Sequence, residues 1–97
     1  MRVISRKALR DFSLLHADSE DALNAWYNEA TTKSWESPVD VKARYPSASI
    51  LPGNRIVFNI KGNTYRLVVK VNYTYESIFI RFVGTHSEYD KIDARTI

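Results

Sequence analysis

The segment Gly84–Asp90, with the sequence GTHSEYD, holds residue types that proton-transfer chemistry needs. An imidazole exchanges protons near neutral pH, and a phenol can donate one. His86 and Tyr89 are three positions apart, so a short helix would place both side chains on one side. The hydroxyl of Thr85 or Ser87 could cap that helix. The simpler alternative is that the segment only ends a strand.

Three runs in which apolar and other residues alternate precede this segment, at 55–60, 64–72 and 77–84. These runs contain arginine and lysine side chains. Alternation with a period of two predicts strands and separates the residues onto two faces. The apolar face, expected toward the core, carries Ile56, Phe58, Ile60, Tyr65, Leu67, Val69, Val71, Ile78, Ile80 and Phe82. The opposite face carries Arg55, Asn59, Arg66, Lys70, Phe79 and Arg81, with Val57, Val68 and Val83 between them. A one-residue slip would bury the cations, which favours this register.

Cations interleaved with apolar and aromatic groups are typical of surfaces that bind single-stranded nucleic acid. The valines strengthen this interpretation, because an exposed apolar patch usually marks a partner surface. Together with His86 and Tyr89, the face suits phosphodiester cleavage by attack of a ribose 2′-OH on the adjacent phosphorus. That route requires neither metal nor cofactor. A partly solvated sheet whose cations only confer solubility is the alternative.

The bulk composition is that of an ordinary globular protein, with 44% hydrophobic and 26% charged residues. A chain of 97 residues is expected to form a single domain over 1–97. The absence of cysteine excludes disulfides and thiolate metal sites. His16 lies among acidic residues and is expected to be solvated. No stretch resembles an export signal or a membrane span, so a cytoplasmic protein is expected.

Charge is segregated along the chain, although the net charge is only +3. Residues 11–40 hold seven acidic side chains and one basic side chain, Lys33. Residues 54–83 hold five basic side chains and one acidic side chain, Glu76. This asymmetry predicts one basic surface, which would attract a polyanion.

The first half of the chain has the period of helices rather than strands. Ser5 is a candidate cap for a helix with the apolar stripe Ala8, Leu9, Phe12 and Leu15. Asp18 or Ser19 is a candidate cap for a second helix with Ala22, Leu23, Trp26 and Ala30 on one side. Ser37 and Pro38 predict the start of a third helix of about two turns, which Pro46 bounds. A turn with positive φ is expected at Gly62 and Asn63.

These elements predict an α+β fold. Its antiparallel sheet of three to four strands carries two N-terminal helices on one face, and a short C-terminal helix follows the sheet. The residues 1–5 could add a further strand.

The chain resembles the HigB type of RelE-like toxins, the ribosome-dependent mRNA interferases of type II toxin–antitoxin modules. The resemblance is carried by VFNIKGNTYRLVVKVNY and IFIRFVGTHSEYDKIDA, and also by MRVIS and SPVDVKARYPSASIL, so it covers nearly the whole chain. It implies a RelE-like fold and metal-independent cleavage of translated mRNA in the ribosomal A site. The implied partners are mRNA, the ribosome and a helix-turn-helix antitoxin of the HigA type. Operator DNA would be contacted only through that antitoxin.

The resemblance also implies roles for single residues. Arg66 is similar to the strand arginine that such toxins place near the scissile phosphate, and Arg81 would be a second phosphate contact. His86 and Tyr89 resemble the acid–base residues of the superfamily, without a ranking between base and acid. Lys61 and Lys70 resemble lysines of some relatives. Arg55 is a further candidate RNA contact because it lies on the predicted basic face, not because of the resemblance.

Two other hypotheses use the same residues. The chain could be a non-catalytic module that binds RNA or the ribosome, with His86 and Tyr89 as stacking contacts. It could also be a protein-interaction domain whose valine-bearing face docks a partner helix. Salt-dependent RNA binding would exclude the last hypothesis, and cleavage would exclude both.

Overall fold

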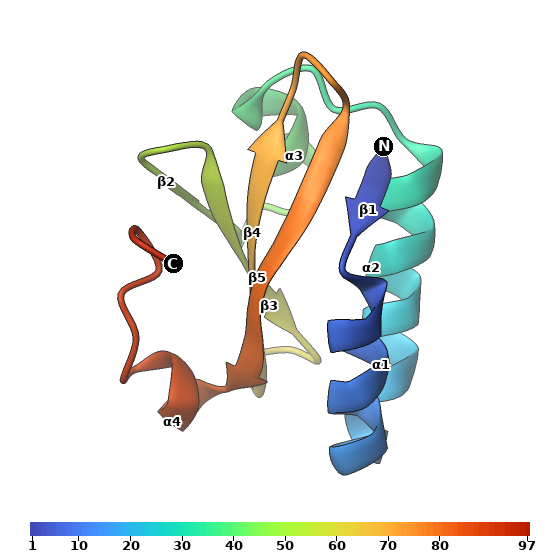
Figure 1. Cartoon of the computed structure of the whole chain (residues 1–97), viewed down its shortest axis with the longest axis vertical. Coiled ribbons are helices and arrows are strands. Elements are labelled where there is room, and N and C mark those ends of the chain that lie inside the picture. Colours follow the sequence, from blue (N-terminus) through green and yellow to red (C-terminus); the bar gives the residue numbers. More distant parts are fainter.

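A computed structural model describes residues 1–97, and its helices and strands form an α+β fold (Figure 1). In chain order the elements are β1 (Arg2–Ile4), α1 (Arg6–Leu15), the 3₁₀ turn η1 (Ala17–Ser19), α2 (Glu20–Thr32), α3 (Pro38–Arg44), β2 (Ser49–Leu51), β3 (Arg55–Ile60), β4 (Tyr65–Asn72), β5 (Ser77–Thr85) and α4 (His86–Tyr89). None of the helices is both long enough and apolar enough to cross a lipid bilayer.

The strands form one sheet in the order β1-β5-β4-β3-β2. β1 runs parallel to β5, and the other pairs are antiparallel. The predicted sheet of three to four antiparallel strands is therefore corrected to five strands with one parallel edge. The strand considered for residues 1–5 is confirmed as β1, whereas β2 was not predicted. Each of these edge strands has only three residues, too few to show a period. The Pro52-Gly53-Asn54 turn before β3 was the available signal for β2, since Gly53 and Asn54 both adopt positive φ.

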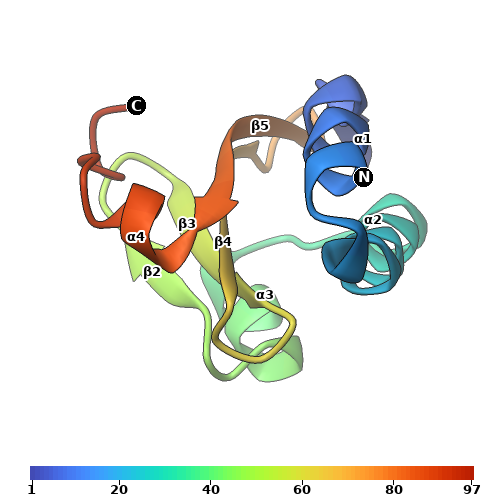
Figure 2. The same cartoon turned by 90° about the horizontal axis from the view of Figure 1, so that it is seen from below.

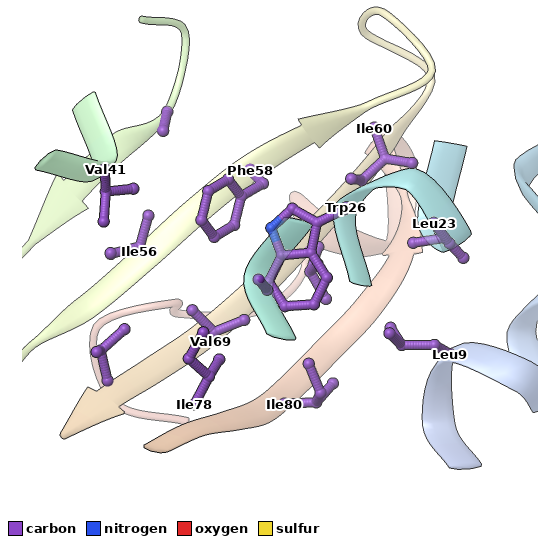
Figure 3. Close-up of a cluster of buried hydrophobic side chains, with 14 of the residues drawn as sticks. Leu9, Leu23, Trp26, Val41, Ile56, Phe58, Ile60, Val69, Ile78 and Ile80 are labelled. Carbon is purple, nitrogen blue, oxygen red and sulfur yellow. The ribbon is translucent and has the colours of Figure 1, made fainter. Parts of the chain in front are cut away.

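Three helices cover one face of the sheet, and α4 with the C-terminal segment lies on the other (Figure 2). Leu9, Phe12, Leu23 and Trp26 are buried as predicted. The Trp26 ring points toward the strands and lies 5.4 Å from the Phe58 ring centroid (Figure 3). Helix α3 adds the fully buried Val41 to this core, and the loop before it adds Trp35.

The predicted apolar stripe of α1 is wrong at its last residue. Leu15 is 82% exposed. The helix ends there, and His16 leaves helical geometry at φ −130° and ψ 76°. Leu15 is the last residue of the helix, and no neighbouring element packs over it.

Serine residues stand at the start of the first three helices as predicted, but their hydroxyls do not cap them. Ser5, Ser19 and Ser37 make no side-chain capping hydrogen bond. Ser5 adopts a left-handed conformation at φ 76°, and the Ser19 hydroxyl donates to the carbonyl of His16 at 2.7 Å. Pro38 does occupy the first turn of α3, where its missing N–H costs nothing.

A β-bulge changes the predicted register of β5. Val69 pairs with Ile80 and Val68 pairs with Phe82, so Arg81 is an additional residue between them. Nine of the ten predicted inner residues lie in the main core, but Phe82 packs on the outer face. Val83 packs against the main core instead, contrary to the prediction. The periodicity of β5 alone does not reveal that Phe82 and Val83 exchange faces, because this exchange depends on how β5 pairs with β4.

The outer-face valines are not an exposed patch, which corrects the prediction. Val57 and Val68 are buried, at 3% and 0% exposure, together with Ala94 of the C-terminal segment. Ile92 and Ile97 pack against the same cluster. The chain thus covers its own apolar strip, and the hypothesis that this strip docks a partner helix loses its basis.

Ala94→Arg tests this cover. The longer side chain does not fit the space over the valines, so we expect the free energy of unfolding to fall by about 1–3 kcal/mol. Urea denaturation measures the change. Ala25→Arg, at an exposed position of α2, should leave stability nearly unchanged. Equal stability of the two variants would contradict the observed packing of the C-terminal segment.

Candidate active site

Helix α4 begins directly where β5 ends and is held there by a capping box. The backbone N–H of Glu88 donates to the Thr85 hydroxyl at 3.1 Å, and the backbone N–H of Thr85 donates to the Glu88 carboxylate at 2.8 Å. The bond from the Thr85 N–H to the carboxylate holds the pKa of the Glu88 carboxyl below its ordinary value. Thr85, one of the two predicted caps, is thus confirmed. The box orients a helix of only four residues, which carries His86 and Tyr89.

Arg66 lies on the outer face of β4, opposite Gly84, and is only 8% exposed. Its guanidinium donates to the Asn63 carbonyl at 3.0 Å, to the Tyr65 carbonyl at 3.2 Å and to the Asn63 side-chain oxygen at 2.8 Å. A guanidinium has five N–H groups. Two of them therefore remain for a ligand, and their direction is set by the Asn63 turn.

The same turn departs from its prediction. Positive φ occurs at Lys61 and Gly62, not at Gly62 and Asn63. Asn63 instead uses its carbonyl and its side-chain oxygen to hold Arg66. The sequence did not reveal this role, because periodicity relates residues within one element. Asn63 lies in the turn before β4, and Arg66 lies in β4.

Tyr89 is brought to Arg66 by the packing of α4 on the outer face. The Arg66 Cζ lies 5.9 Å from the Tyr89 ring centroid, and the Phe82 and Tyr89 ring centroids are 6.5 Å apart. Gly84 makes room for this arrangement, since a Cβ at Gly84 would lie 2.4 Å from Cζ of Phe82. The arginine and the tyrosine predicted as site residues are therefore neighbours.

His86 is half-exposed and faces an acid that the sequence analysis did not assign. Its Nδ1 lies 3.1 Å from Oδ2 of Asp90. A carboxylate only accepts hydrogen bonds, so Nδ1 is the donor, and Nε2 has no hydrogen-bond partner within the chain. The available signal was the spacing of four residues within a predicted helix.

The remaining predicted cations are distributed over three places. Lys61 forms an ion pair with Asp18 at 2.8 Å, beside the helices. Arg55 donates to the main-chain oxygen of Ile97 at 2.8 Å. Lys70 and Arg81 line a hollow at the other end of β4. Lys70 lies four positions after Arg66, which is about 13 Å along a strand. The predicted basic face is therefore divided, with the C-terminal segment between its parts.

A sequence model of the HigB_toxin family, described as the RelE-like toxic component of a toxin–antitoxin system, matches residues 19–92. The chain belongs to this family. It is 33% identical over 92 residues to the mRNA interferase toxin HigB of Escherichia coli (strain K12), a match that covers 93% of this chain and 88% of the relative. The mRNA interferase HigB of Shigella flexneri matches with the same figures. The mRNA interferase HigB of Escherichia coli O6:H1 is 20% identical over 94 residues, 95% of this chain and 91% of the relative.

The match to the HigB_toxin family includes every residue of the candidate site. Arg66, His86, Tyr89 and Asp90 lie within residues 19–92, and Ala94 lies outside them. No group of three or more histidine, cysteine, aspartate or glutamate side chains in this HigB-family chain could hold a metal ion.

Beside the site, the HigB-family chain joins its helical layer to β4 through Asp18. The Tyr65 hydroxyl donates to Oδ1 of Asp18 at 2.5 Å, and Lys61 donates to Oδ2. His16 stacks on Phe12 at 4.4 Å and lies 5.4 Å from the Tyr65 ring. The prediction of a solvated His16 is thus wrong, because the end of α1 folds it onto aromatic rings.

Asp18 should make the free energy of unfolding of this HigB-family chain depend on pH in the acidic range. Its hydrogen bonds with Lys61 and Tyr65 hold the pKa of its carboxyl below the ordinary value of 3.8. The folded chain therefore binds this proton more weakly than the unfolded chain. The stabilisation is present above pH 3.8 and is lost as the pH falls through the lowered value.

Asp18→Asn tests this linkage. We expect the variant to be less stable than the parent at pH 7, with a difference that shrinks as the pH falls below 3.8. Urea midpoints measured from pH 7 to pH 2.5 give the comparison. Glu36→Gln, at an exposed loop position whose side chain forms no hydrogen bond or ion pair, is the control and should leave the urea midpoints close to those of the parent. A difference from the parent that is constant over the whole range would refute the role of Asp18.

Proposed function

We propose that this HigB-family chain is an mRNA interferase, a toxin that cleaves RNA with residues 1–97 acting as one unit. The observation that supports the proposal is the arrangement around Arg66. The Arg66 guanidinium lies over the Tyr89 ring, and Arg66 pairs with Gly84, two residues before the helix that carries the His86–Asp90 pair. A phosphate stabiliser and two proton-transfer groups are what phosphodiester cleavage requires. The relatives are named as mRNA interferases.

The proposed reaction begins with attack of a ribose 2′-OH on the adjacent phosphorus. Of His86 and Tyr89, one accepts the 2′-OH proton and the other protonates the leaving 5′-oxygen. Arg66 donates to the phosphate oxygens, whose negative charge increases in the transition state. Because internal hydrogen bonds already orient the guanidinium, little reorganisation is needed when the phosphate arrives.

The proposed substrate is mRNA in the ribosomal A site, and the proposed protein partner is an antitoxin of the HigA type. The family is that of the toxic component of a toxin–antitoxin system, which supports an antitoxin partner. The outer face holds Arg66, Lys70 and Arg81, which supports contact with an RNA strand. Contact with operator DNA would occur only through the antitoxin, and no role at a membrane is proposed.

Cleavage of mRNA on programmed ribosomes tests the proposal. Purified protein is added to ribosomes with a defined codon in the A site, and primer extension maps the cuts. Replacing the 2′-OH at the mapped nucleotide with hydrogen should abolish cleavage, because the proposed nucleophile is then missing. Persistent cleavage of the 2′-deoxy substrate would refute the mechanism. Ribosome or RNA binding without any cleavage would favour the non-catalytic alternative.

A further inference from the structure

A hollow of about 440 Å³ lies at the end of the sheet distant from Arg66. Its lining combines two cations, an aromatic ring and two side-chain amides, contributed by Lys70, Arg81, Phe79, Asn54 and Asn72. The hollow is formed by the end of β4, the first half of β5, the turn between them and the turn before β3. Its size is within the range typical of small-ligand sites.

The cations of the hollow have no partner within the chain. Lys70 and Arg81 are exposed and form none of the ion pairs of the structure. Phe79 pairs with Lys70 across β4 and β5 and is half-buried, so its ring lies on the outer face next to both cations. Alternation with the buried Ile80 places Arg81 on this face. Two unpaired cations beside a ring are suited to a nucleotide, whose phosphate and base they can contact.

The amides add hydrogen-bonding groups at the edge of the hollow. Asn72 accepts the N–H of Tyr75 with its side-chain oxygen at 3.0 Å, which leaves its NH₂ group as a donor. The main-chain oxygen of Asn54 accepts the N–H of Val71 at 2.9 Å, so its left-handed turn is anchored to β4. Amide groups of this kind can pair with the edge of a base.

We propose that this hollow binds one nucleotide of single-stranded RNA, with its base on Phe79 and its phosphates at Lys70 and Arg81. The inference rests on the proposed function, because it places the nucleotide on the same RNA strand that Arg66 contacts. Both sites lie on the outer face, about 13 Å apart along β4, and the RNA strand would pass over the C-terminal segment that covers Val68 between them. A strand bound at both ends would be held in register, which would make the hollow a specificity-determining subsite.

Binding of an uncleavable oligonucleotide tests the subsite separately from catalysis. The probe is a fluorescein-labelled 2′-O-methyl RNA of eight nucleotides, and fluorescence anisotropy gives the dissociation constant. Phe79→Leu keeps an apolar side chain but removes the ring, so binding should weaken by about 5- to 100-fold, whereas Phe79→Tyr should restore it. Thermal unfolding confirms that each variant is folded.

The salt dependence of oligonucleotide binding measures the contribution of the cations. Arg81→Gln, at an exposed position, should lower the slope of log affinity against log salt by about 0.7. Lys7→Gln, at an exposed position of α1 on the opposite side, should leave the slope unchanged. An unchanged slope for Arg81→Gln would overturn the phosphate contact even if the Phe79 variants failed to fold.

An abasic site moved along the oligonucleotide locates the base contact. At one position of the abasic site, the losses of binding free energy caused by the missing base and by Phe79→Leu should not be additive. Both changes remove the same stacking contact. Additivity at every position, no binding by the parent protein, or a mononucleotide that binds as tightly as the oligonucleotide would overturn the proposal. Cleavage on ribosomes is measured in parallel. A parent protein that binds with this pattern but never cleaves would leave the subsite standing and refute the proposed function.

Discussion

Arg66→Ala is expected to slow single-turnover cleavage of ribosome-bound mRNA by about 10²- to 10³-fold, the usual effect of removing a positioned donor to a developing charge. Growth arrest on induction should be lost with it. In the proposed mechanism, the two guanidinium N–H groups that are not used inside the chain would donate to the phosphate. Removing them affects the transition state more than the bound substrate, so the rate should fall while ribosome affinity changes little.

The burial of Arg66 requires a stability control for this experiment. Its side chain is 8% exposed and bonded to Asn63, so Arg66→Ala should also reduce the free energy of unfolding. Asn63→Ala removes the side-chain contact at 2.8 Å but keeps the guanidinium. It should therefore destabilise the turn and slow cleavage much less. If a folded Arg66→Ala protein cleaved at the parental rate, Arg66 would not belong to the site.

Tyr89→Phe and His86→Ala are each expected to slow single-turnover cleavage by about 10²- to 10⁴-fold, the range for a positioned acid or base. Tyr89→Phe is the sharper of the two changes. It keeps the ring that lies over Arg66 and near Phe82, and it removes only the hydroxyl. The assay must contain programmed ribosomes at saturation, so that a change of affinity cannot be mistaken for a change of rate.

A stacking role makes a different prediction for these residues. A stacking contact acts equally on the bound substrate and the transition state, so its loss would lower ribosome occupancy and not the saturated rate. Ser87→Ala, at an exposed position of the same helix that makes no capping bond, is the matched control. Parental rates for both Tyr89→Phe and His86→Ala at saturation would show that α4 only ends the sheet.

Local patterns predicted much of the framework that positions the site. Alternation in β3 and β4 correctly placed Phe58 and Leu67 toward the helices and Arg66 on the other face, because neighbouring residues of a strand alternate whatever lies beside them. The spacing of His86 and Tyr89 and the cap at Thr85 could also be predicted locally. Both depend on contacts within about four residues of one helix.

Pairing between strands decided what the local pattern could not. The bulge opposite Val68 and Val69 moved Phe82 to the outer face, next to Tyr89. A bulge is a property of two strands together, so the alternation of β5 alone cannot reveal it. The three-residue strands β1 and β2 likewise exist only through their hydrogen bonds to β5 and β3.

Tertiary packing also decided which of the predicted cations could act together. The sequence alone determined that the strand cations share one face and that His86 and Tyr89 share one helix. Only the folded chain showed that Ala94 covers Val68, that Asp18 holds Lys61 beside the helices, and that Asn63 holds Arg66. These contacts join residues of different elements. The period of one element does not show which side chain from another element will pair with its charged groups or cover its apolar surface.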